Sequence, residues 1–374
     1  MQLLKCSALI LCLAYLALGA GPAAADVTVA TISKPAPVNF FEGRLAWSSF
    51  DPATNRFVLM TRIGDVTTAL PVAPRSVPFD VDLGPDRNGA TVAVYSRCRR
   101  EPDYTTAVGN AIINQLPDWR SGRGCNLYKF DFDAGRETRV RGVSTGRASE
   151  FLPSIWRNRI AFARVYERRS GKAGQRAYLY RASTTGRGGS ERFTAGPRAN
   201  LRFCFARRGK RVCRIPVELG PTALDLHARQ LAFAWTTATG PGGCESSSGI
   251  WLDTISQARK RIATGCSGDI QAIQLLSPTI SSNRINYGYI GFGDSMFNRI
   301  HRYVLSTGDV EELAVGTTKT VLWTSTGAGS TVYLVSGGYE PGCAPAARVI
   351  EPGVGPDTGP CPLVVSPASI SSRL

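Results

Sequence analysis

A short alternation of apolar and polar residues recurs six times along the 374-residue chain. In each copy a turn residue is followed by an apolar residue, a small or polar residue, and then an aromatic or aliphatic one. The copies are GRLAWSSFD from Gly43, ATVAVYSRC from Ala90, NRIAFARVY from Asn158, RQLAFAWTT from Arg229, NRINYGYIG from Asn283 and STVYLVSGG from Ser330. A period of two is typical of β-strands, so each copy predicts a strand, and the roughly even spacing predicts an internal repeat.

Further strands are predicted on both sides of this motif. The middle copies are followed by hairpin sequences, each with a turn rich in Gly, Thr, Ser or Asp: CNLYKFDFDAGRETRV, AYLYRASTTGRGGSERF, GIWLDTISQARKRI and RIHRYVLSTGDVEEL. Apolar segments such as VPFDVDLG, SEFLPSIW, TALDLHA and QAIQLLSPTI precede the motif. Each repeat is therefore a four-stranded antiparallel meander, and six such units in radial array form an all-β, six-bladed β-propeller. We expect residues 26–374 to form this single domain.

Several stretches of the repeat carry a resemblance to a known family. They are LGPDRNGATVAVYS (Leu83–Ser96), LLSPTISSNRINYG (Leu275–Gly288), LYKFDFDAGRE and YVLSTGDVEEL. The repeat resembles the WD40-like propeller repeat of the TolB-type proteins, and the resemblance covers nearly the whole chain after the leader. It implies the propeller fold and no particular activity. Because the propeller is expected to begin near Val38, with no separate N-terminal domain, the resemblance does not extend to the Tol-Pal envelope role.

The first 25 residues are predicted to be a secretory signal peptide. Lys5 is the only charge before an apolar stretch from Ala8 to Leu18, and Ala23-Ala24-Ala25 forms a small-residue cleavage site. The stretch is too short to span a membrane, and no later segment is long enough. We therefore expect a secreted protein, extracellular, periplasmic or held in the cell envelope.

A propeller leaves an exposed edge unless its ring is closed. The final repeat has the strand sequences KTVLWTST, TVYLVSGG and CPLVVSP but no fourth, whereas DVTVATISK (26–34) is an orphan strand at the other end. We expect this N-terminal strand to complete the last blade. The alternative is that these residues form a disordered leader.

Cleavage after Ala25 leaves eight of the ten cysteines, an even number that predicts disulfides in an oxidising compartment. The spacing favours pairing in sequence order: Cys98 with Cys125, Cys204 with Cys213, Cys244 with Cys266 and Cys343 with Cys361. Zinc is the alternative. With no Cys-x-x-Cys pair and only two histidines, His227 and His301, we expect neither a metal site nor a cofactor.

The predicted connectivity places all eight cysteines on one face. Loops between second and third strands share this face with the connections between blades, whereas the opposite face has short turns. Function usually resides on elaborated loops above a rigid scaffold, so this cysteine-rich face is the predicted working surface. The alternative is that insertions collect on whichever face tolerates them. One of its loops contains residues 107–116, a predicted short helix that either packs on the propeller or docks a partner.

The chain is strongly basic, and its charge is unevenly distributed. The net charge is +16, 37 of the 44 basic residues are arginine, and residues 303–374 carry a net charge of −3. Basic runs in loops of the cysteine-rich face provide the candidate binding residues Arg99, Arg100, Arg168, Arg169, Lys172, Arg207, Arg208, Lys210 and Arg211. Such clusters attract polyanions. No nucleic-acid-binding motif appears, so we expect a monomer whose partner is a protein, a glycan or an anionic envelope polymer; the alternative is solvated surface arginines.

No catalytic motif is recognisable. The sequence has no Gly-x-Ser-x-Gly, and neither histidine stands beside a serine or cysteine nucleophile. Asp80, Glu150 and Asp225 are predicted to start innermost strands and to line the central channel, as acid-base groups or as hydrogen-bonding groups for a ligand. A ligand- or protein-binding scaffold is therefore the favoured function, and a hydrolase or lyase at the channel mouth is the alternative.

Overall fold

The computed structural model describes residues 27–31, 38–103, 117, 119–166, 177–185, 189–194, 203–207, 209–214, 217–238, 246–254, 257–267, 272–292, 297–316, 320–328, 331–338, 346–350 and 363–365. Within these ranges the regular secondary structure is β-strand, apart from a 3-10 turn at Trp119–Ser121. The helix predicted for residues 107–116 lies outside them.

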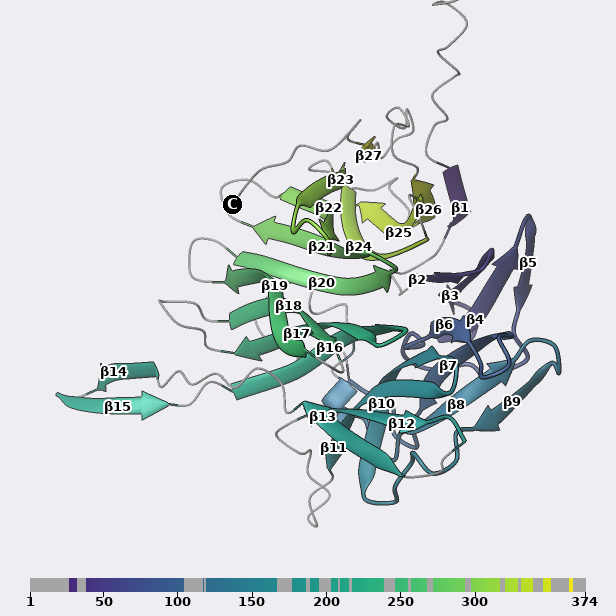
Figure 1. Ribbon diagram of the computed structural model, residues 1–374, viewed down its shortest axis with the longest axis horizontal. Coiled ribbons are helices and arrows are strands. Elements are labelled where there is room, and N and C mark those ends of the chain that lie inside the picture. The colour runs from purple at the N-terminus through teal and green to yellow at the C-terminus, as the bar shows by residue number, and fades with distance from the viewer. Residues whose placement is uncertain are drawn as a thin grey trace, which may run out of the picture.

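Three of the sheets are four-stranded antiparallel meanders of the predicted kind, and their strands pair in sequence order (Figure 1). The first contains β2 (Val38–Phe41), β3 (Arg44–Asp51), β4 (Arg56–Ile63) and β5 (Val66–Ala69). The second contains β6 (Asp82–Pro85), β7 (Thr91–Arg97), β8 (Asn126–Asp131) and β9 (Arg136–Arg139). The third contains β10 (Ala148–Trp156), β11 (Arg159–Tyr166), β12 (Ala177–Ser183) and β13 (Ser190–Thr194).

A nine-stranded sheet follows the third meander along the chain. Its strands are β16 (Val217–His227), β17 (Gln230–Ala238), β18 (Ser246–Thr254), β19 (Gln257–Ser267), β20 (Ala272–Ser281), β21 (Arg284–Phe292), β22 (Phe297–Val304), β23 (Val310–Gly316) and β27 (Leu363–Val365). Between the third meander and this sheet, β14 (Phe203–Arg207) and β15 (Lys210–Arg214) form a separate hairpin. In Figure 1 this hairpin stands apart from the other sheets.

The last sheet combines the first described strand with three strands from the C-terminal part of the chain. It has the order β1-β26-β25-β24, with β24 (Thr320–Ala328), β25 (Thr331–Gly338), β26 (Ala346–Ile350) and β1 (Val27–Thr31). The predicted pairing of the N-terminal strand with the final repeat is confirmed, because Val27 lies opposite Val349 and Thr31 opposite Ala346.

Two details of the sequence prediction need correction. The structure has five blade sheets rather than six separate ones, because the pair Ser267–Ala272 joins β19 to β20 and makes one sheet of two repeats. The third strand of the final sheet is β26, whereas β27, in the segment CPLVVSP, pairs with β23 at the edge of the neighbouring sheet. The architecture is an all-β propeller with four-stranded antiparallel blades.

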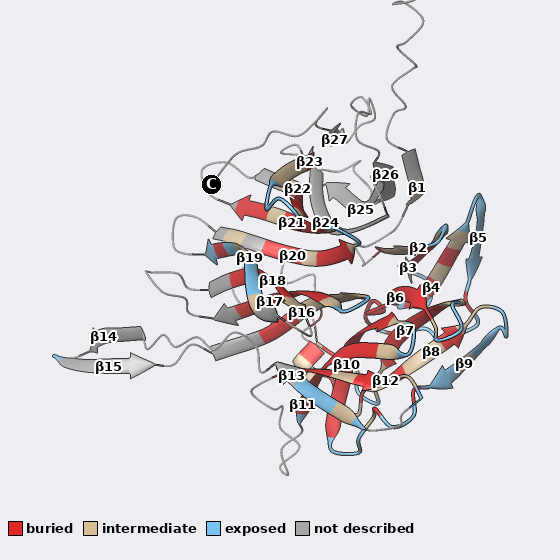
Figure 2. Cartoon of the chain, in the orientation of Figure 1, coloured by how far each residue is buried: buried red, intermediate tan, exposed pale blue. Residues whose placement is uncertain are grey.

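The hydrophobic core lies between neighbouring sheets. One cluster packs Phe79 and Val81 against Leu59 of the first sheet, and another packs Phe151 of the third sheet against Phe233 of the nine-stranded sheet. Inner strands are consequently buried and outer strands exposed, as Figure 2 shows for β10 in red and β5 in blue. Burial of apolar side chains at each boundary therefore holds the blades face to face.

Candidate functional site

The basic loops are only partly within the described residues. Arg99 and Arg100 follow β7 and are exposed. For Arg207, Lys210 and Arg211 the structure describes the backbone of the β14–β15 hairpin. The remaining candidates Arg168, Arg169, Lys172 and Arg208 lie outside the described residues. A shared basic surface on these loops therefore stays a prediction.

The predicted disulfide between Cys98 and Cys125 is present. It joins the two ends of the connection between β7 and β8, as expected for a loop between second and third strands. Cys266 is also disulfide-bonded, whereas Cys244, Cys343 and Cys361 lie outside the described residues. Cys204 lies directly opposite Cys213 in the β14–β15 register. Opposed residues of an antiparallel pair have the Cα separation that a disulfide needs, which supports the predicted bond.

Asp80 is a buried carboxylate that joins two blades. Its Oδ1 accepts hydrogen bonds from the Ser96 backbone N–H at 2.8 Å and from Arg75 at 3.3 Å. Its Oδ2 accepts the backbone N–H of Leu152, in the next blade, at 2.7 Å. The Arg75 guanidinium also forms an ion pair with Glu101 at 2.6 Å. With all these contacts internal, Asp80 holds strands together.

Glu150 lies beside this network, in strand β10. Its Oε1 accepts a hydrogen bond from Arg164 Nε at 3.0 Å, and Arg164 also donates to the carbonyl oxygen of Val143. Burial raises the pKa of Glu150 to about 7, and the neighbouring Arg164 opposes the shift. The side chain is fully buried, which supports a structural role.

Asp225 takes part in a repeated contact between innermost strands. Its position corrects the sequence prediction, because β16 starts at Val217 and Asp225 lies near the end of the strand. Its Oδ2 accepts the backbone N–H of Ile280 in β20 at 2.5 Å. In the same way, Asp82 of β6 accepts the N–H of Ile155 in β10 at 2.9 Å.

Uncharged side chains make the same contact at two further boundaries. Asn39 Oδ1 accepts the N–H of Leu83 at 3.1 Å, and Ser154 Oγ accepts the N–H of Leu226 at 2.7 Å. The hydrogen bonds run from β2 through β6, β10 and β16 to β20, and we call the accepting residues Asn39, Asp82, Ser154 and Asp225 the clasp residues. Each satisfies a backbone donor that would otherwise be buried without a partner.

Burial raises the pKa of both clasp carboxylates. The pKa of Asp225 is raised to about 7. The pKa of Asp82 is raised well above its ordinary value by burial and, in addition, by the charge of Asp225. Ser154 Oγ lies 3.5 Å from Asp225 Oδ1 and also hydrogen-bonds Asp82, so it stands between the two acids. Both shifts favour the protonated, neutral forms of these carboxyl groups.

The two histidines make aromatic contacts. His227, the last residue of β16, stacks on Trp156 with ring centroids 4.0 Å apart, and burial lowers its pKa. His301 lies within β22 as expected and stacks on Tyr289 at 4.9 Å, and burial lowers its pKa to about 4. Both imidazoles are therefore neutral packing groups at neutral pH.

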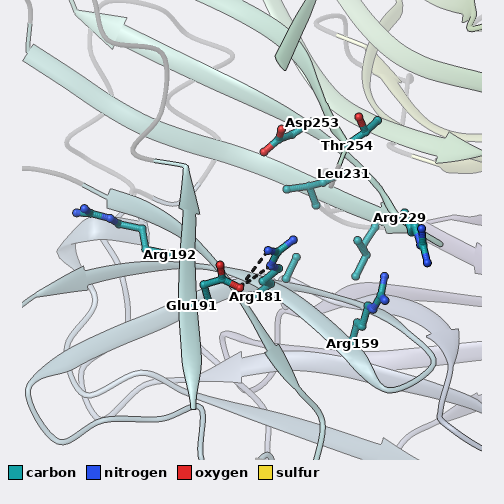
Figure 3. Close-up of a pocket in the computed structure, with 10 residues that line it drawn as sticks. Arg159, Arg181, Glu191, Arg192, Arg229, Leu231, Asp253 and Thr254 are labelled. Carbon is teal, nitrogen blue, oxygen red and sulfur yellow. Dashed lines mark hydrogen bonds and ion pairs between the residues drawn. The ribbon is translucent and has the colours of Figure 1, made fainter. Parts of the chain in front are cut away.

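A pocket that the sequence did not reveal lies between the third sheet and strands β16, β17 and β18 (Figure 3). The cavity has a volume of about 340 Å³ and is lined by Arg159, Ala161, Arg181, Glu191, Arg192, Leu226, Arg229, Leu231, Asp253 and Thr254. These residues lie close to the turns β10–β11, β12–β13, β16–β17 and β18–β19. Because consecutive strands are antiparallel, these turns lie at the opposite end of the blades from the β7–β8 connection that carries the disulfide.

The lining of the pocket is predominantly cationic. Arg181 is ion-paired with Glu191 at 3.0 Å, as the dashed lines in Figure 3 show. Arg159 and Arg229 lie together at the other end of the pocket in the same view. Neither makes an ion pair with an acidic side chain among the described residues. Unpaired guanidinium groups beside a cavity are suited to bind a carboxylate or a phosphate.

A weak signal for this pocket exists in the sequence. Arg159 and Arg229 occupy similar places in the repeated motif, in NRIAF and RQLAF. Arg159 is the first residue of β11, and Arg229 lies in the turn just before β17. Asp253 and Thr254 end β18, in the same repeat as Arg229, whereas Arg159 belongs to the third sheet. Only the packing of these two sheets brings the set together.

The described part of the chain contains no group of three or more His, Cys, Asp or Glu side chains placed to hold a metal ion. No helix there is both long and apolar enough to cross a membrane.

No family model and no curated protein matches the sequence. Solved structures with a similar fold include TolB from Acinetobacter baumannii, with 13% identity, 83% of this chain covered and a TM-score of 0.43. The match spans 65% of the TolB chain, which is less than two thirds of its length.

Two glycoside-cleaving enzymes are also similar in structure. An α-L-arabinofuranosidase from Fusarium graminearum matches with 9% identity, 88% of this chain, 98% of that chain and a TM-score of 0.45. An α-L-arabinanase from Penicillium chrysogenum, complexed with arabinobiose, matches with 12% identity, 87% and 98% coverage and a TM-score of 0.45. With identities this low and TM-scores below 0.5, we take the propeller architecture from the strand order of this chain and draw no function from these proteins.

Proposed function

We propose that the chain is a secreted β-propeller that binds an anionic ligand, such as an acidic glycan or envelope polymer. The observation that carries this proposal is the pocket between the third sheet and β16–β18. Arg159 and Arg229 line it without acidic partners among the described residues, and the cavity is large enough for a small ligand.

The arrangement of the sheets supports a propeller ring that is closed. Strands β16–β19 and β20–β23 repeat the same four-strand order, and the single residue pair Ser267–Ala272 joins them. Strand β24 contacts both β20 and β2, and β1 supplies the fourth strand of its sheet, which supports a closed ring.

The cysteine chemistry supports secretion. The Cys98–Cys125 disulfide is stable in an oxidising compartment, and the apolar leader is the segment expected to deliver the chain there. On this proposal the ligand lies outside the cytoplasm.

The internal contacts of the candidate acidic residues favour a binding function over hydrolysis. Asp80, Glu150 and Asp225 are each engaged by an arginine or by backbone N–H groups inside the protein. A general acid or base must reach the reacting group of its substrate, so these three residues are better suited to hold blades together.

Polygalacturonate, an anionic polysaccharide, is the probe for the test. Binding is measured by fluorescence titration at low salt and at about 0.3 M salt, where a charge-driven interaction weakens. We expect Arg159→Glu with Arg229→Glu to lower the affinity at least tenfold. The matched control Arg56→Glu with Arg87→Glu makes the same change in net charge at exposed sites outside the pocket, and its affinity should change less than threefold.

A third variant distinguishes the two basic regions. If Arg207→Glu, Arg208→Glu and Arg211→Glu abolish binding while the pocket variant binds normally, the basic loops are the binding surface and the pocket is not. An equal loss of affinity in the pocket variant, the loop variant and the control would show that binding depends only on net charge, and it would contradict a defined binding site.

A further inference from the structure

The pocket offers more than positive charge. The hydroxyl oxygen Oγ1 of Thr254 is buried and has no hydrogen-bond partner among the residues that the structure describes. The half-buried carboxylate of Asp253, the neighbouring residue, makes no hydrogen bond or ion pair within the described part of the chain. Buried polar groups are nearly always paired in folded proteins, so this pair of residues marks a place for hydrogen-bonding groups of a ligand.

Asp253 also makes the pocket a poor site for a bare anion. Its carboxylate faces the same cavity as Arg159 and Arg229 and would repel a second negative group nearby. Burial raises the pKa of Asp253, and the charges of Arg259 and Arg181 oppose that shift. A ligand that brings hydroxyl donors to Asp253 and one anionic group to the arginines satisfies both ends of the site.

An apolar strip completes the lining. Ala161 and Leu231 are buried, and Leu226 is partly buried beside them. Together they give the cavity a non-polar wall between its charged groups. A pyranose ring combines the required features, because it carries hydroxyl groups around its edge and C–H groups on its face.

We propose that this pocket binds an acidic sugar, a single saccharide unit bearing one carboxylate or phosphate group. The anionic group binds Arg159 and Arg229, the hydroxyl groups bind Asp253 and Thr254, and the C–H face of the ring packs on Leu226 and Leu231. This inference rests on the proposed function and names its ligand class. The site can distinguish an acidic sugar from an inorganic anion, because an inorganic anion brings no sugar hydroxyl groups to Asp253 and Thr254.

Titration calorimetry on the full secreted chain tests the inference with five probes: glucuronate, glucose 6-phosphate, glucose, acetate and inorganic phosphate. We expect one or both acidic sugars to bind at least tenfold more tightly than glucose, acetate or phosphate. The glucuronate and glucose 6-phosphate arms distinguish a carboxylate ligand from a phosphate ligand.

Variants at the hydroxyl-binding end provide the decisive comparison. Asp253→Asn and Thr254→Val should each weaken acidic-sugar binding about fivefold to tenfold. The affinity for inorganic phosphate should stay unchanged in Thr254→Val and should rise in Asp253→Asn, because the latter removes the negative charge that repels an anion. Thr254→Ser keeps the hydroxyl and should bind like the unmodified protein.

The outcomes separate this inference from the proposed function. If phosphate binds as tightly as glucose 6-phosphate and acetate as tightly as glucuronate, the sugar ring is not recognised and the inference fails, although anion binding stands. Unchanged sugar affinity in both Asp253→Asn and Thr254→Val would overturn it as well. If polygalacturonate and every anionic probe fail to bind, the proposed function itself fails.

Discussion

Asp225 and Ile280 belong to adjacent repeats, and the Asp225 carboxylate accepts the backbone N–H of Ile280 at 2.5 Å. The contact places an ionisable group in the interior, where burial raises its pKa from the ordinary 3.8 to about 7. Between these two pH values native Asp225 retains a proton that the unfolded chain releases. Its contribution to the free energy of unfolding therefore falls as the pH rises through this window and is constant above it.

Asp225→Asn should remove this part of the pH dependence. Asparagine is neutral at all pH values and keeps an oxygen that accepts the Ile280 N–H. We expect the variant to gain stability relative to the unmodified protein between about pH 5 and about pH 7.5, by up to about 1.4 kcal/mol per pH unit. Urea unfolding midpoints at both pH values measure the change. Asp309→Asn, on an exposed turn, is the control, and a difference that does not vary with pH would contradict the prediction.

Asp80→Ala should be strongly destabilising, because it leaves the Arg75 guanidinium buried without one of its partners. Removing one member of a buried ion pair costs about 3–5 kcal/mol. Asp65 provides the matched control, since it pairs with Arg62 at 2.8 Å but its side chain is fully exposed. Asp65→Ala should cost less than about 1 kcal/mol. Equal losses in the two variants, measured by thermal unfolding, would show that burial of the pair is unimportant.

Gly84→Ala should disturb the contact between the second and third sheets. A Cβ at this position would lie 2.2 Å from the carbonyl oxygen of Ile155, so β6 and β10 would have to separate. We expect a loss of at least about 2 kcal/mol. Gly146→Ala is the comparison, because a Cβ there meets nothing within 4 Å, and it should leave the urea midpoint unchanged. A Gly84→Ala protein as stable as this control would mean that the strands adapt without cost.

Removal of residues 27–31 should expose the edge of β26. Val29 and Ala30 also pack against a cluster that includes Val38 and Trp47. We expect a chain that begins at residue 32 to unfold at lower temperature and to form oligomers, since unpaired edge strands associate. Light scattering after size exclusion detects the oligomers.

The control for this truncation is Arg62→Ala, which removes the hydrogen bond from Arg62 to the Val29 carbonyl oxygen and keeps the strand. It should remain monomeric. A truncated chain that is also monomeric and equally stable would show that β1 is dispensable.

The sequence predicts the positions of the strands well, but it predicts less well which strands pair with each other. The alternation in NRIAFARVY and RQLAFAWTT is a local property of the strands β11 and β17 that these stretches form. Which edges meet is a non-local property. The position of CPLVVSP in the sequence predicts a strand of the final sheet, although its strand β27 pairs with β23. The alternation of apolar and polar residues does not predict the pairing of Ser267 with Ala272 either.

The candidate site could be predicted only in part. Asp225 was singled out as an acid of an innermost strand, but its hydrogen bond to Ile280 depends on how two strands approach each other. The pocket is harder to predict from the sequence. Its residues Arg159 and Asp253 are separated by almost a hundred residues and line one cavity only when two blades pack.

The pairing of β1 with β26 has a consequence for the order of folding. During synthesis Val27 emerges early, but the residue opposite it, Val349, is made 322 residues later. Contacts between such distant residues form slowly because the chain must first close a long loop. Strand β1 therefore has no partner until almost the whole chain is available, and a chain interrupted before β26 leaves both edges of β1 unpaired.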